Sequence, residues 1–112
     1  MFIGVARVVL QFPEARSLKD RRRVVKSFKD RVRAKLPVSI AEVGDAERLQ
    51  VATLGIAVVA NEAERCQEIL SSVVQAARTL HNAVFADVRT EIVPFGSDGR
   101  GIQHGIEDSF EP

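Results

Sequence analysis

The sequence predicts a ferredoxin-like α+β domain, in which two helices cover one face of a four-stranded antiparallel sheet. Two observations support this fold. Strand-like and helix-like apolar periods alternate along the chain in the order βαββαβ. Each of the two helical segments also begins at a residue suited to capping. With 112 residues, 46% of them hydrophobic, the chain fits one compact domain that needs no disulfide.

The first predicted strand covers residues 2–12 and ends before Pro13. Its even positions are apolar or small throughout, so this side should face the core. The odd positions are mixed but include Ile3, Val5 and Val9. We therefore expect the outer side to be at least partly covered as well, for example by another subunit.

A basic amphipathic helix is predicted for residues 18–36. Ser17 is its N-cap, Asp20 gives a near-relative of a capping box, and Pro37 stops the helix. At ~100° per residue the apolar side chains fall within about 80° of arc, which makes one stripe for packing on a sheet. This stripe consists of Leu18, Val25, Phe28, Val32 and Leu36.

The middle of the chain predicts two strands. Residues 38–43 form a short one, and a connection opened by Gly44 and Asp45 leads to a second at 49–60. The second is long, largely apolar and β-branched. This composition is typical of a central strand that is covered on both faces.

A second helix is predicted to follow Asn61 as its N-cap, with Glu64 completing a capping box. Its carboxylates near the start suit the positive end of the helix macrodipole. Its apolar stripe consists of Cys66, Ile69 or Leu70, Val73, Ala77 and Leu80.

The last predicted strand, residues 84–93, alternates between an apolar and a polar side. Its expected buried side consists of Val84, Ala86, Val88 and Ile92. The folded domain is therefore assigned to residues 1–93. Residues 94–112 hold four of the seven glycines and few aliphatic side chains, so they are predicted to form a flexible tail unless a partner orders them.

Charge is distributed very unevenly along the chain. Residues 16–35 contain ten of the sixteen Lys and Arg residues and only two acids, which gives a net charge of +8. The whole chain has a net charge of only +1, so the remainder must sum to −7. A basic patch of this kind attracts polyanions. The candidates for phosphate contacts are Arg16, Lys19, Arg22, Arg23, Lys26, Lys29 and Arg33.

The three consecutive arginines at 21–23 stand in the first turns of this helix, where the macrodipole is already positive and carboxylates would be more stabilising. The functional interpretation is an RNA partner that is bound through its phosphates, with little base specificity. The alternative is a solvated helix face that pairs with the acidic rest of the domain. The sheet itself is not expected to read bases, because its third strand has no aromatic residue on which they could stack.

An enzyme is difficult to build from these residues. Cys66 lies on the apolar stripe of a helix and is expected to be a buried, inert thiol. His81 and His104 show no metal-site spacing. No phosphate-binding glycine loop or dinucleotide motif is present, so no cofactor is expected.

Three carboxylates form the remaining chemical candidate. Glu42, Asp45 and Glu47 gather near the second strand and its connection. Carboxylates in such a group could bind a cation or do acid/base work. A solvated polar turn is the preferred interpretation, and no metal is assigned to them.

The sequence also predicts a cytoplasmic protein. The single cysteine excludes an internal disulfide and fits a reducing compartment. No apolar run approaches the ~20 residues of a membrane helix. Met1 leads directly into a strand, without the basic region and cleavage site of an export signal, so no leader is expected.

Four segments carry a family resemblance: Phe2-Ile-Gly-Val5, Ala15-Arg-Ser-Leu-Lys-Asp-Arg-Arg-Arg-Val-Val-Lys-Ser27, Val38-Ser-Ile-Ala-Glu-Val-Gly-Asp45 and Ala52-Thr-Leu-Gly-Ile-Ala-Val-Val59. With them the chain resembles the YlxP-like family of small bacterial proteins, a conserved domain of unassigned function, from Met1 to about Val93. The resemblance implies a ferredoxin-like fold. It also implies a role connected with RNA or ribosomes, because family members are often encoded beside translation and ribosome-maturation factors. It implies no catalytic residue.

These observations lead to one main hypothesis and two alternatives. The chain is expected to be a non-enzymatic accessory factor of translation or ribosome assembly that binds RNA or the ribosome through its first helix. The first alternative is a homo-oligomeric interaction module, such as a homodimer, that associates through Ile3, Val5 and Val9 on the sheet face. The second is an enzyme or small-ligand sensor that uses Glu42 and Asp45.

Overall fold

The computed structural model describes residues 1–96 of the chain. Six elements follow one another: β1 (Phe2–Gln11), α1 (Leu18–Lys35), β2 (Ser39–Val43), β3 (Val51–Ala60), α2 (Ala63–Arg78) and β4 (Val84–Pro94). Their order is the predicted βαββαβ. Most of the predicted tail, residues 97–112, lies outside the described residues.

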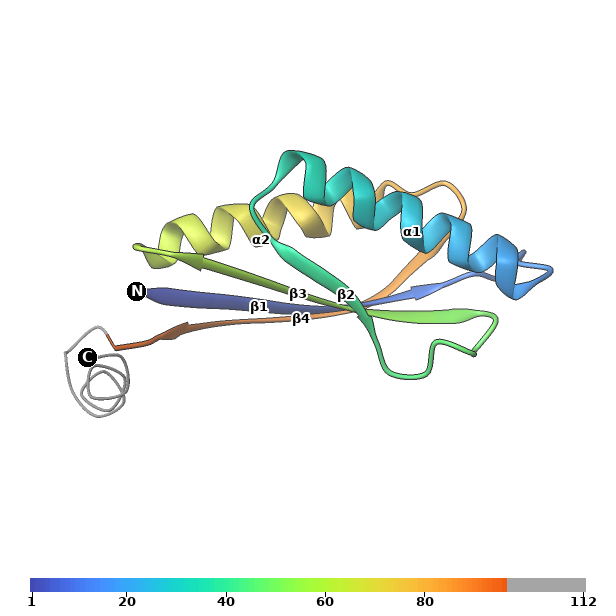
Figure 1. Cartoon of the computed structure of the whole chain (residues 1–112), viewed down its shortest axis with the longest axis horizontal. Helices are drawn as coiled ribbons and strands as arrows, with labels where there is room; N and C mark the ends of the chain where they lie inside the picture. The colour runs from blue at the N-terminus through green and yellow to red at the C-terminus, as the bar shows by residue number, and fades with distance from the viewer. Residues whose placement is uncertain (97–112) are drawn as a thin grey trace, which may run out of the picture.

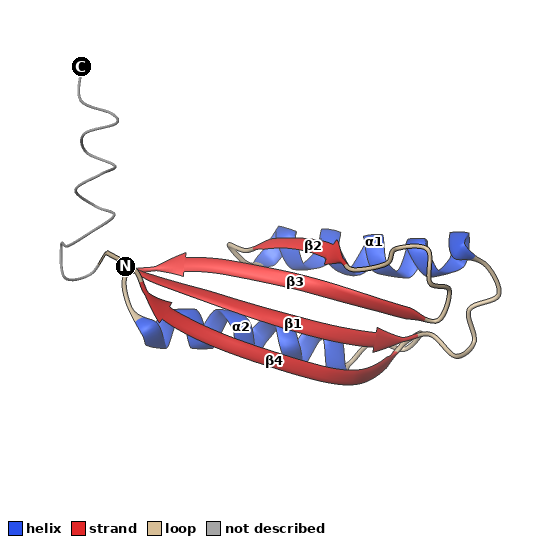
Figure 2. Ribbon diagram, turned by 90° about the horizontal axis from the view of Figure 1, so that it is seen from below, coloured by secondary structure: helices blue, strands red, loops and turns tan. Residues whose placement is uncertain are grey.

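The strands form one antiparallel sheet in the order β2-β3-β1-β4. Both helices lie on the same face of this sheet (Figure 1). Figure 2 looks onto the opposite, open face, with the helices behind the strands. This arrangement is the ferredoxin-like fold, as predicted. β3 is an inner strand as expected, but only one of its faces is covered, because both helices lie on the same side of the sheet.

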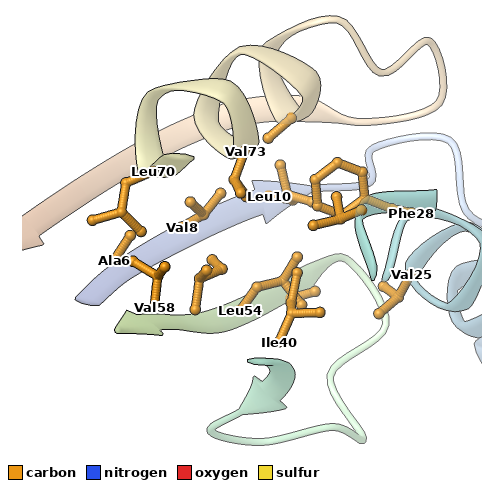
Figure 3. Close-up of a cluster of buried hydrophobic side chains, with 14 of the residues drawn as sticks. Ala6, Val8, Leu10, Val25, Phe28, Ile40, Leu54, Val58, Leu70 and Val73 are labelled. Carbon is orange, nitrogen blue, oxygen red and sulfur yellow. The ribbon is translucent and has the colours of Figure 1, made fainter. Parts of the chain in front are cut away.

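The core lies between the helices and one side of the sheet (Figure 3). The even positions of β1 point into it and pair with buried positions of β3, as in Val8 opposite Leu54. Phe28 of α1 and Val73 of α2 are buried against them. The predicted core side of β1 and the middle of the predicted stripe of α1 are therefore confirmed.

Gly4 of β1 lies where α2 packs closely on the sheet. A Cβ atom at this position would lie 2.9 Å from Cδ1 of Leu70 and 3.1 Å from Cβ of Cys66. The first distance is shorter than ordinary packing allows, so the missing side chain lets the helix approach the strand. Cys66 is fully buried as predicted, and its Sγ lies 3.7 Å from the carbonyl oxygen of Phe2.

The start of α2 differs from the prediction. The N-cap is Glu62 rather than Asn61, and it makes no side-chain capping bond. The first bond of the helix runs from the N–H of Cys66 to the carbonyl of Glu62 at 3.3 Å. Because the helix begins one residue later than predicted, Asn61 and Glu64 no longer have the spacing of a capping box.

The alternation predicted for β4 is wrong at the start of the strand. Val9 of β1 pairs with Asp87 while Leu10 pairs with Phe85, so one extra residue is inserted between these two positions of β4. Such a β-bulge reverses the side on which the preceding residues point. Phe85 therefore packs against the core, and Val84, predicted to be buried, is 50% exposed.

The sheet continues slightly beyond the predicted domain boundary at residue 93. β4 extends to Pro94, and the N–H of Phe95 donates to the carbonyl of Met1 at 2.8 Å. Within residues 1–96, neither helix has the length and apolar composition that crossing a membrane requires.

Candidate nucleic-acid interface

Helix α1 carries most of the basic segment, and its first turn lies at one end of the sheet (Figure 1). The β2–β3 and α2–β4 connections lie at the same end. Ser17 is the N-cap as predicted, because its Oγ accepts a hydrogen bond from the N–H of Asp20 at 3.2 Å. The cations of the first turns are therefore close to side chains from other elements.

Arg21 does not belong to the exposed basic surface. Its side chain is 0% exposed and lies on the core side of α1 with three apolar residues of the helix. Its Nη1 and Nη2 donate to the two carboxylate oxygens of Glu42, the first at 3.2 Å. Its Nε and Nη2 also donate to the carbonyl of Val51 at 3.2 and 2.7 Å. One guanidinium thus joins α1 to both β2 and β3.

This pair has the bidentate geometry in which the planar guanidinium matches a carboxylate. Every buried side-chain nitrogen and oxygen of residues 1–96 has a hydrogen-bond partner, so no polar atom of the Arg21 side chain is buried without one. The sequence contains a signal for the burial of Arg21. Arg21 stands four residues before Val25, seven before Phe28 and eleven before Val32, which is the spacing of one helix face.

The three predicted carboxylates near β2 do not form one site. Glu42 binds Arg21, and Oε1 of Glu47 accepts a hydrogen bond from Nη2 of Arg22 at 3.1 Å. Oδ1 of Asp45 accepts the backbone N–H of Glu47 at 2.9 Å. No three His, Cys, Asp or Glu side chains within residues 1–96 are arranged to hold a metal ion. Two of these acids therefore form ion pairs with arginines of α1, and the third stabilises a turn.

Asp30 engages two more of the predicted phosphate contacts. Its carboxylate lies 2.7 Å from Nζ of Lys26 and 3.8 Å from Nη1 of Arg33. Nη2 of Arg33 also donates to the carbonyl of Ile40 at 2.6 Å. The hydrogen bond from Lys26 is the main cause that lowers the pKa of Asp30 below its ordinary value of 3.8, against a smaller opposing effect of burial. The charges of Lys26, Arg33 and Lys29 lower this pKa further.

The remaining four predicted residues have no ion-pair partner in the part of the chain that the structure describes. Three of them are exposed around the start of α1, and Lys29 is half-buried. If Glu42 and Glu47 are counted with the basic segment, its net charge falls from +8 to +6. We call these four residues the basic surface: Arg16, Lys19, Arg23 and Lys29.

A groove of about 460 Å³ lies beside the basic surface. It is lined by Arg23 and Asp20 of α1, by Glu14 before the helix, and by His81 and Asn82 of the α2–β4 connection. Its size is within the range of small-molecule sites. Its polar side chains carry both signs of charge, so it is not a site for anions alone.

Comparison with known protein families gives one match. A family model described as "Protein of unknown function (DUF503)" matches residues 3–90. The chain belongs to this family. The basic surface and the Arg21–Glu42 pair both lie within the matched part of the DUF503 domain. Among curated proteins, none matches the sequence.

Solved structures similar to this DUF503 domain include de novo designed proteins. The de novo designed protein Foldit4 is 14% identical, with a TM-score of 0.51, and the match covers 85% of this chain and 99% of Foldit4. The de novo designed protein LFR1 1 with ferredoxin fold is 17% identical, with a TM-score of 0.45 over 87% of this chain and 89% of the design. At these identities the similarity concerns the fold alone.

The open sheet face carries the residues predicted for an oligomer interface. Ile3, Val5 and Val9 all point to this side, and Val5 is 40% exposed while the other two are half-buried. Six large hydrophobic side chains of residues 1–96 are exposed, and the strand registers place five of them on this face. These five are Val5, Val43, Val59, Val84 and Val93.

Proposed function

We propose that this DUF503 domain is a non-enzymatic, cytoplasmic accessory factor of translation or ribosome assembly, and that it binds structured RNA through the basic surface of α1. The main support is that Arg16, Lys19 and Arg23 are exposed and unpaired, among the described residues, around a positive helix end. The resemblance to the YlxP-like bacterial family, with its translation-linked gene neighbours, favours the same assignment.

The fold divides the cations of α1 into two groups with different costs of phosphate binding. Arg22 and Lys26 make only exposed ion pairs, which contribute little and can be exchanged for a phosphate. Arg21 cannot be exchanged, because releasing it would leave the largely buried Glu42 without its counter-charge. Arg21 therefore anchors the helix, and the exposed cations around it contact the RNA backbone. Contacts of this kind fix the position of the RNA without reading its sequence.

The proposal is tested by binding of the full chain to ribosomal RNA fragments across a salt series. Replacing Lys19→Glu together with Arg23→Glu should weaken binding at least about tenfold and reduce the slope of log K against log salt by roughly 1.5 to 2, as expected for two lost phosphate contacts. The matched control is Arg65→Glu with Arg78→Glu on α2, which changes the net charge by the same amount.

Two results would contradict the proposal. The first is a wild-type protein that does not bind RNA even at low salt. The second is an equal loss of binding in the α1 and α2 variants, because this would show a response to net charge rather than to a surface on α1.

A second candidate function is a protein-interaction module that associates through the open sheet face. The observation that favours it is the concentration of exposed valines on that face. A single Val59→Asp substitution, at a side chain that is 61% exposed, should then abolish association without unfolding the domain. Light scattering that finds the same mass for the variant and the wild type would count against this function.

A further inference from the structure

Strand β4 forms a long outer edge of the sheet. Within residues 1–96 it pairs only with β1, so one side of its backbone has no partner strand there. The opposite edge is formed by β2, which has only five residues, whereas β4 has eleven. Long unpaired edges are templates for another strand.

The part of β4 that follows the bulge is complementary to itself. If a second copy pairs antiparallel about Thr90, each Val88 faces the partner's Ile92, and each Arg89 faces the partner's Glu91. The two Thr90 residues face one another. Opposite charges, β-branched residues and Thr–Thr pairs are the cross-strand combinations that stabilise sheets. Two-fold symmetry makes every pair except the central one occur twice.

The charges of the isolated domain favour this pairing. Arg89 lies directly opposite Arg7 on β1, a like-charge pair that is unfavourable across two strands. Arg7 is compensated by Asp87, whose Oδ2 lies 3.7 Å from its Nη2. Neither Arg89 nor Glu91 has an ion-pair partner within residues 1–96. A second copy would supply both.

We infer that two copies of this chain associate edge to edge through Asp87–Val93 of β4, antiparallel about Thr90, and so join their sheets into one continuous sheet. The pairing is limited at both ends. The bulge interrupts the regular strand before Asp87, and Pro94 has no N–H to donate. Because both copies use the same segment, the contact closes as a dimer and does not continue into a filament. The contact is made by the backbone edge of β4, although the side chains of Arg89, Glu91 and Val93 lie on the open face. It does not involve the basic surface of α1.

Variants that exchange the charges of Arg89 and Glu91 test the pairing. The mass of the protein in solution, measured over a concentration series, gives the dimer dissociation constant of each variant. Arg89→Glu places a carboxylate opposite the partner's Glu91, and Glu91→Arg places a guanidinium opposite the partner's Arg89. Each variant should raise the dimer dissociation constant by about tenfold or more. The combined variant restores opposite charges and should return the constant close to that of the wild type. Arg65→Glu on the exposed side of α2, which changes the net charge by the same amount as Arg89→Glu, serves as the control and should leave it unchanged.

Disulfide formation tests the register. In an antiparallel pair the Cα atoms of facing residues are about 4.5–5.5 Å apart, within the range of a disulfide. Thr90→Cys should therefore cross-link two chains on oxidation. Val88→Cys should not, since the two cysteines would be offset by four residues, roughly 13 Å along the strands. The native Cys66 is fully buried and serves as the internal blank.

A wild-type protein that stays monomeric at high concentration would overturn the inference. It would also be overturned by a combined charge variant that fails to recover association, or by Val88→Cys cross-linking as readily as Thr90→Cys. Circular dichroism of each variant shows whether the domain is folded, and Arg89→Glu removes the repulsion from Arg7, so unfolding is not its expected effect. None of these results depends on RNA binding.

Discussion

The two helices cover the same face of the same sheet, yet they are attached to it differently. α2 buries four apolar side chains and one thiol: Ile69, Leu70, Val73, Ala77 and Cys66. α1 buries three apolar residues and one arginine: Val25, Phe28, Val32 and Arg21. α2 is thus held by close apolar packing, whereas the first turn of α1 is held by a polar clamp. A helix with so many cations can be fixed at one end by one of them, and this leaves its exposed side to other contacts.

The largest expected effect comes from removing the clamp of α1. Arg21→Ala should lower the free energy of unfolding by about 3–5 kcal/mol, because it leaves Glu42 largely buried without a counter-charge. The carbonyl of Val51 loses two donors as well. Urea unfolding measures the change. Arg22→Ala is the matched control, and its exposed pair with Glu47 should contribute less than about 1 kcal/mol.

Replacing both partners separates the charge from the packing. Arg21→Met combined with Glu42→Gln removes the buried charges and keeps similar volumes, so most of the lost stability should return. Equal effects of Arg21→Ala and Arg22→Ala would show that α1 is not held by a buried pair.

The corresponding change for α2 is steric. Gly4→Ala places a Cβ atom 2.9 Å from Cδ1 of Leu70 and 3.0 Å from Cγ1 of Val58, which should cost about 1–3 kcal/mol of unfolding free energy. Gly55→Ala is the control, since its Cβ would meet only Val43 on the open face, at 3.2 Å. Thermal or urea unfolding compares the two. A stability loss no larger at Gly4 than at Gly55 would mean that α2 is not packed closely on β1.

The sequence predicted the parts of the structure that depend on local patterns. Strand alternation, helix periodicity and the Ser17 cap are properties of neighbouring residues, and they led to the correct fold class. The bulge in β4 depends on its pairing with β1, so the side of the sheet to which Phe85 points could not be predicted from the sequence of β4 alone. In the basic segment, the spacing of Arg21 with Val25, Phe28 and Val32 indicates that it lies on the core side of the helix. The ion-pair partners of Arg21 and Arg22 could not be predicted in this way, because Glu42 and Glu47 lie 21 and 25 residues further along the chain and are brought close only by the sheet.

Helix capping gives a smaller contrast. Ser17→Ala should cost about 1 kcal/mol, because the N–H of Asp20 loses its acceptor at the start of α1. Asn61→Ala should cost almost nothing, since Asn61 is not the N-cap of α2. Glu62→Ser should instead stabilise α2 by a similar amount, by providing the absent cap. Unfolding curves of the three variants check this. A large loss of unfolding free energy in Asn61→Ala would instead show that Asn61 caps α2, as the sequence pattern predicts.

The smallest expected effect concerns the exposed side of α1, where Asp30 lies among cations. Its pKa is lowered below 3.8, mainly by the hydrogen bond from Lys26. A carboxyl with a lowered pKa in the folded state contributes stability that is fully present above its ordinary pKa and is lost as the pH falls through the lowered value. The contribution of Asp30 should therefore disappear only below about pH 3.8.

Carbon-detected NMR titration of the Asp30 carboxyl measures this directly. Lys26→Ala should raise its pKa towards 3.8, because the largest cause of the shift is removed. Arg65→Ala on α2, whose pair with Glu68 lies on the other helix, should leave it unchanged. The effect on stability is small since the pair is exposed. The pKa of Asp30 nevertheless distinguishes the two variants, because it should rise in Lys26→Ala and stay unchanged in Arg65→Ala. If the pKa of Asp30 does not change in Lys26→Ala, the hydrogen bond from Lys26 is not formed in solution. Lys26 would then be free to bind a phosphate without first leaving Asp30.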